Sequence, residues 1–169
     1  TAVAQAFTKL QAVDKEMAKA LDTGNAMGAA AKLHQAVMAN PTGKDEQTTF
    51  ELHNEYIDAL LALGEHVSDT SELSLDPQLE TFHLMNYAIL YGPQQMENVS
   101  ELSVLGWAAL KAGQKSEFLN ERINQDFGIL RFVDNIVENA YIRSTGGTAE
   151  ADAKFGMKTN DDAYDAFQE

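Results

Sequence analysis

Cysteine is absent from the 169 residues of this chain. Without a thiol there is no disulfide framework, thiolate zinc site, iron–sulfur cluster or cysteine nucleophile. Positive charge is also scarce, because 12 Lys and Arg residues accompany 26 Asp and Glu residues and the formal net charge is −14. Such a surface repels nucleic acids and anionic lipid headgroups, which need cationic side chains to neutralise them. We therefore expect no nucleic-acid partner.

Long hydrophobic runs are missing as well. No apolar stretch approaches the roughly 18–20 residues that a membrane-spanning helix needs, and no signal peptide is evident. Thr1 is an unusual natural start for a protein. We expect the chain to be a soluble piece excised from a longer protein.

Proline occurs only three times, so few points force a helix to break. Apolar residues recur at helical spacing, and no β-type alternation of useful length is present. The pattern predicts four long helices over about residues 3–38, 45–67, 77–110 and 116–144. Short connections between them favour an all-α fold, an antiparallel up-down four-helix bundle that occupies residues 1–147.

Several local signals modify these helices. Two glycines weaken the first helix within residues 22–28, where we expect a bend or a short break. Asp76 and Pro77 mark a helix start, because a carboxylate caps free N–H groups and Pro suits the first helical position. Gly92 and Pro93 must kink or break the third helix, since Pro lacks the amide donor.

The first and fourth helices carry heptad-like apolar seams. The predicted inward residues are Val3, Phe7, Leu10, Met17 and Leu21 in the first helix and Ile123, Phe127, Leu130, Val137 and Tyr141 in the fourth. The first seam faces either the core of one chain or a coiled-coil contact between two chains. Residues 148–169 form either an acidic tail or the start of a fifth helix around residues 161–167.

Motifs of catalysis are not found, so we do not expect an enzyme. There is no nucleophile elbow and no Gly-rich phosphate loop. Glu80 and His83 match the Glu-x-x-His spacing of di-iron bundles once, but such sites need a second copy. We expect no metal or other cofactor, and a carboxylate-bridged metal bundle stays only as a further hypothesis.

A candidate ligand site lies just before the predicted kink. His83, Asn86 and Tyr87 share one face of the third helix there. A kink opens a gap between helices, and pockets in bundles form between helices. The alternative explanation is ordinary boundary packing, with apolar ring bodies and solvated polar tips.

Arginine occurs only three times, as Arg122, Arg131 and Arg143, all in the fourth helix. Arg131 lies next to the apolar row, where a guanidinium at a buried edge can bind a carboxylate ligand in bidentate fashion. The alternative is an intramolecular ion pair with one of the many acids. The candidate ligand-binding set is therefore His83, Asn86, Tyr87 and Arg131, for an organic anion or an amino acid.

Residues 73–86, with the sequence LSLDPQLETFHLMN, resemble a segment of the extracytoplasmic helical sensor regions of bacterial methyl-accepting chemotaxis proteins and related sensor histidine kinases. The likeness extends over about residues 60–130. Those regions continue with Leu-Pro and then Leu-Arg-x-x-Gly. Here Gly92 precedes Pro93, and Ser103 stands in the place of that arginine.

The resemblance implies a periplasmic sensor domain of an inner-membrane chemoreceptor. Membrane helices outside this sequence would anchor the receptor, and two copies would form a homodimer. A small solute would bind between helices and shift them. The alternative is a helical module that recognises a partner protein, such as a periplasmic binding protein, without a small-molecule site of its own.

The Arg131 hypothesis is tested by Arg131→Ala. If the guanidinium grips an anionic ligand, the variant should lose more than about 1 kcal/mol of binding free energy, because a charge-assisted hydrogen bond is removed. Isothermal calorimetry with the anion measures this loss. Unchanged affinity would remove Arg131 from the site.

Overall fold

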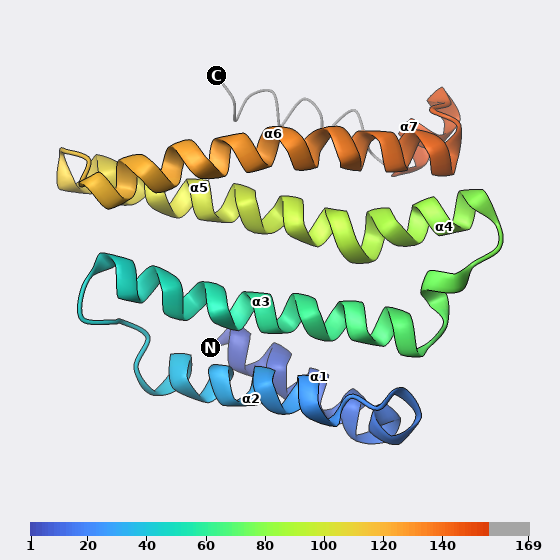
Figure 1. Cartoon of the computed structure of the whole chain (residues 1–169), viewed down its shortest axis with the longest axis horizontal. Coiled ribbons are helices and arrows are strands. Elements are labelled where there is room, and N and C mark those ends of the chain that lie inside the picture. Colours follow the sequence, from blue (N-terminus) through green and yellow to red (C-terminus); the bar gives the residue numbers. More distant parts are fainter. Residues whose placement is uncertain (156–169) are drawn as a thin grey trace.

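The computed structural model describes residues 1–155, and their regular elements are all helical (Figure 1). The all-α prediction is confirmed, and no strand occurs in this part of the chain. No helix within it is long and apolar enough to span a bilayer. The predicted helical segment at residues 161–167 lies outside the described residues.

The first predicted helix is divided into α1, Ala2–Leu21, and α2, Gly24–Ala39. The expected break is confirmed, and it occurs where Asp22 adopts the left-handed conformation with φ 47°. Asp tolerates this region better than most residues. The Thr23 hydroxyl donates a hydrogen bond to Asp14, which holds the corner together. The Thr1 hydroxyl lies 3.9 Å from the Met38 sulfur, so α1 folds back along α2.

The core of this N-terminal part is built around one aromatic stack. The Phe7 ring stacks on His34 with centroids 4.0 Å apart, and the Phe7 and Tyr56 rings meet edge to face. The seam predicted for α1 is buried only in part, since Val3 is 49% exposed. Leu10 of the seam packs against this core, whereas Met17 is 44% exposed.

Helix α3, Glu46–Thr70, begins where the sequence predicts. Asp45 is its N-cap and forms a capping box with Thr48, in which each side chain accepts a hydrogen bond from the other residue's backbone N–H. Helix α2 packs along α3. After α3 the chain turns through a short 3₁₀ segment, η1, Leu73–Leu75.

The third predicted helix contains three consecutive parts: α4, Leu79–Met85; a π-helical segment, η2, Asn86–Tyr91; and α5, Gly92–Ala112. The predicted break at Gly92 and Pro93 does not occur, because the helix continues from the π-helical segment directly into α5. The Gly92 amide donates to the Tyr87 carbonyl, and a Cβ at position 92 would lie 2.7 Å from that oxygen. Only glycine allows this close approach.

Helix α6, Glu117–Thr145, starts where the sequence predicts, after its N-cap Ser116, and ends before Gly146, whose φ is 73°. It packs along α5 and α4. The predicted inward position of Phe127 is wrong, because that ring is 42% exposed, whereas Val133 beside the seam is buried. The short helix α7, Ala149–Phe155, follows, and its Asp152 accepts a hydrogen bond from the Tyr141 hydroxyl.

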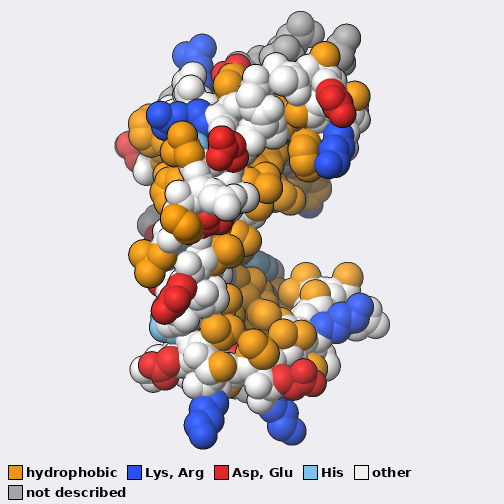
Figure 2. All heavy atoms as spheres, turned by 90° about the vertical axis from the view of Figure 1, so that its right-hand side faces the viewer, with side chains coloured by type: hydrophobic (Ala, Val, Ile, Leu, Met, Phe, Trp, Pro, Cys, Tyr) orange, Lys and Arg blue, Asp and Glu red, His pale blue; other side chains and the backbone are white. Residues whose placement is uncertain are grey.

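The helices form two packed groups, α1–α3 and α4–α6. Contacts between α3 and α5 are sparse by comparison. Figure 2 shows the molecule hollowed between the two groups, with apolar side chains along the walls of the hollow. This opening positions the candidate site.

A buried leucine and an exposed leucine provide a test of the α5–α6 packing. Leu130 of α6 is 1% exposed and Leu110 of α5 is 85% exposed. Leu130→Ala should lower the free energy of unfolding by about 2–5 kcal/mol, because it removes a buried side chain and leaves a cavity. Urea denaturation measures the loss. The matched Leu110→Ala should change stability by less than about 0.5 kcal/mol, and equal effects in the two variants would contradict this packing.

Candidate functional site

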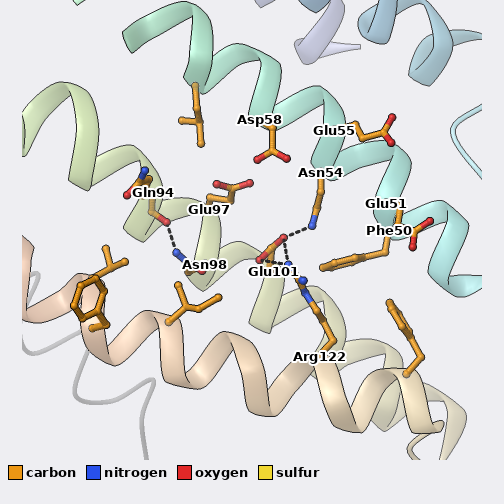
Figure 3. A pocket seen from close by; sticks show the side chains of 15 residues that line it. Phe50, Glu51, Asn54, Glu55, Asp58, Gln94, Glu97, Asn98, Glu101 and Arg122 are labelled. Carbon is orange, nitrogen blue, oxygen red and sulfur yellow. Dashed lines mark hydrogen bonds and ion pairs between the residues drawn. The ribbon is translucent and has the colours of Figure 1, made fainter.

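A pocket of about 640 Å³ lies between α3, α5 and α6 (Figure 3). Its walls carry polar side chains at four-residue spacing, which places both members of each pair on one face of a helix. Helix α3 contributes Asn54 and Asp58, and α5 contributes Glu97 and Glu101. The polar pair of α3 and the acidic pair of α5 therefore face each other across the hollow.

Arg122 of α6 is the cation at the centre of the pocket. Its Nη2 atom lies 3.4 Å from Oε1 of Glu101, and its Nε atom lies 3.1 Å from Oδ1 of Asp126. The guanidinium also lies over the Phe50 ring, with Cζ 5.0 Å from the centroid. One cation therefore joins an acid of α5 to an acid of its own helix.

Both acids bound to Arg122 are withdrawn from water. Glu101 is 8% exposed and accepts a further hydrogen bond from the Asn54 amide of α3. Asp126 is 0% exposed, and neither of its carboxylate oxygens has a hydrogen-bond partner within residues 1–155. Its 3.1 Å contact with Arg122 is an ion pair without hydrogen-bond geometry. Buried carboxylates are usually satisfied more fully than this.

The electrostatics of the pocket follow from this crowding of acids. Burial, together with the charges of Glu101 and Asp58, raises the pKa of Glu97 to about 7. Burial and the Asp126 charge raise the pKa of Glu101, although Arg122 and the Asn54 hydrogen bond oppose the change. Burial likewise raises the pKa of Asp126. The single guanidinium therefore does not compensate for the acids around it, and the pocket attracts positive charge.

The same hollow has a second, apolar part of about 560 Å³. It shares Glu101 and Phe118 with the first part and extends to Val104 and Trp107 of α5. The Phe50 and Phe118 rings meet edge to face, with centroids 5.8 Å apart, where the two parts join. A molecule with one charged end and one apolar end matches this layout.

The four residues predicted from the sequence lie elsewhere, and none of them lines this pocket. His83 and Asn86 are buried, and the Tyr87 ring lies 6.0 Å from the Tyr141 ring of α6. Arg131 is exposed, so its expected place at a buried edge is wrong. Their proposed role in binding a ligand stays a prediction.

Two charge pairs in the sequence point to this pocket. Arg122 and Asp126 form an i,i+4 pair of opposite charge, and Glu97 and Glu101 form an i,i+4 pair of like charge. A like-charged pair is destabilising in an isolated helix, which singles out this part of α5. No local pattern, however, shows that α3 brings Asn54 to the same place.

Metal binding finds no support in the described part of the chain, because no three His, Asp or Glu side chains within it converge closely enough to hold an ion. Glu80 and His83, the single Glu-x-x-His match, belong to α4 and do not line the pocket. Comparison with protein families, curated proteins and solved structures finds no match to this chain. Its function must therefore be argued from the pocket itself.

The raised pKa of Glu97 predicts a pH dependence of stability. A carboxyl whose pKa is higher in the folded state than in the unfolded state stabilises the fold at low pH, and this contribution disappears as the pH rises through about 7. Glu97→Gln removes the charge that opposes Glu101 and Asp58. The variant should melt at a higher temperature than the wild type at pH 8 and at a similar temperature at pH 5. Calorimetric melting at the two pH values measures the difference, and a lower midpoint for the variant at pH 8 would contradict the repulsion.

Proposed function

We propose that this chain is the ligand-binding sensor domain of a bacterial transmembrane chemoreceptor. The observation that carries the proposal is the pocket between α3, α5 and α6, in which Arg122 joins Glu101 and Asp126 across a helix interface. Ligand sites in helical bundles form between helices in this manner. The resemblance of residues 73–86 to chemoreceptor sensor regions supports the same assignment.

We infer that α2, α3, the α4–η2–α5 unit and α6 are the four rods of an up-down bundle. Consecutive rods run in opposite directions and are joined by short connections, which favours this topology. In the proposed receptor the domain lies in the periplasm, membrane helices outside this sequence anchor it, and two copies form a homodimer. The acidic surface suits a domain that does not bind the anionic headgroups themselves.

The signal would consist of a small movement between the two helix groups. Because contacts between α3 and α5 are sparse, a ligand that bridges them can change their separation at little cost in packing. The π-turn at η2 offers a site where α5 can reorient relative to α4. Helix shifts of about 1–2 Å are sufficient in signalling proteins, provided that the ligand binds one arrangement more tightly than the other.

A thermal-shift screen with the folded protein tests this function. Amino acids, organic acids and amines are added singly, and a true ligand should raise the melting midpoint with increasing concentration, because it binds only the folded state. Calorimetry then measures the affinity. A screen in which no compound raises the midpoint would overturn the small-molecule assignment.

Recognition of a partner protein is the second candidate function. One observation favours it: a row of exposed apolar side chains along one side of α5, namely Met96, Val104, Trp107 and Leu110. Exposed apolar rows of this kind often mark protein contacts. This function would be favoured if no compound in the screen raises the melting midpoint and a periplasmic binding protein binds the domain.

A further inference from the structure

We propose that the pocket between α3, α5 and α6 binds a small organic cation, an alkyl or aryl amine, and that Glu97 and Glu101 receive its ammonium group. The inference rests on the proposed function, because it names the ligand class of the same pocket. It differs from the organic anion or amino acid that the sequence predicts.

The charged side chains in the walls of the pocket are mostly acidic. Asp58, Glu97 and Glu101 face the hollow, and Figure 3 shows their carboxylates directed into it from α3 and α5. Arg122 is the one Lys or Arg among the residues that line the pocket. Its guanidinium is already engaged by Glu101 and Asp126. An anion entering here would meet several carboxylates and one guanidinium that is already ion-paired with two acids, whereas an ammonium group would meet complementary charge.

A buried acid of α6 lies behind the pocket wall, and its charge acts on Glu97 and Glu101. Asp126 lies between Arg122 and Ile129, both of which line the pocket, on the same face of α6. It is fully buried, and its two oxygens have no hydrogen-bond partner in the described residues. Glu97, one turn before Glu101, is partly buried. Arg122 is the one cation that lines the pocket, so an ammonium group bound to Glu97 and Glu101 would supply positive charge that the pocket lacks.

The shape of the pocket favours an organic cation over a metal ion. Its volume of about 640 Å³ is in the range of small-molecule sites and far exceeds the space that an ion needs. Within residues 1–155 no three acidic or histidine side chains are arranged as metal ligands. The Phe50 and Phe118 rings and the apolar part around Trp107 instead provide surfaces for ring–cation and hydrophobic contact with an amine.

Two amines and their neutral counterparts provide the test. The probes are butylamine and 2-phenylethylamine, compared with 1-butanol and 2-phenylethanol at constant ionic strength. An amine should raise the melting midpoint and change the fluorescence of Trp107, the single tryptophan, while its alcohol should do neither. Mg²⁺ at the same concentration controls for general neutralisation of the acidic surface. Amines that act no more strongly than the alcohols or Mg²⁺ would overturn the inference.

Charge-removing variants locate the binding site. Glu97→Gln and Glu101→Gln should each weaken amine binding by more than about tenfold, because each removes a charge-assisted contact while keeping the size of the side chain. Glu138→Gln changes the net charge equally at an exposed position of α6 and should leave the affinity unchanged. Circular dichroism checks that each variant is folded. If Glu101→Gln does not fold, Glu97→Gln, which changes a less buried side chain, tests the pocket alone. Equal weakening in all three variants would overturn the assignment to this pocket.

The two proposals fail in different ways. If an amino acid or organic acid raises the midpoint and the amines do not, the cation inference fails and the sensor function remains. If no compound of any class raises the midpoint, both fail.

Discussion

The ion network of Arg122 with Glu101 and Asp126 is the constraint on which the rest of the site depends. Two buried carboxylates cannot stay charged without a cation close by, since transfer of a charge out of water is costly. Arg122 can lie close to both carboxylates only when α5 and α6 pack in one register. Adjacent Leu102, Leu105 and Leu119 bury apolar surface in the same register, so charge pairing and hydrophobic packing select one arrangement.

The same network explains why the hollow between the two helix groups stays open. The α1–α3 group closes on an aromatic and aliphatic core around Phe7 and Tyr56. Facing α3, however, α5 presents Glu97 and Glu101, and α3 presents Asn54 and Asp58 in return. Carboxylates that are brought together without enough cations repel each other and favour water. The α3–α5 interface therefore retains space that an apolar interface would have filled.

Backbone geometry connects this hollow to the rest of the chain. The π-turn of η2 ends at Gly92, and the pocket-lining residues of α5 begin two residues later, at Gln94. A change in the turn would rotate Gln94, Glu97 and Glu101 together, because they share one rigid helix. The ring of Tyr87 in η2 lies beside the ring of Tyr141, so the π-turn also contacts α6. A change in the conformation of η2 would therefore be passed directly to the pocket-lining residues of α5.

Local patterns in the sequence determined the helical class, the helix starts near residues 45 and 116 and the break after Leu21. These features depend on nearest neighbours along the chain, such as a capping carboxylate or a glycine that weakens a helix. Only the tertiary structure decided that α1 reverses along α2 and that Phe127 and Arg131 face solvent. It also decided that Asn54 of α3 and Arg122 of α6 both contact Glu101 of α5. The reason is physical: the rotation and separation of packed helices are set by the sum of many weak contacts, and no short stretch of sequence contains that sum.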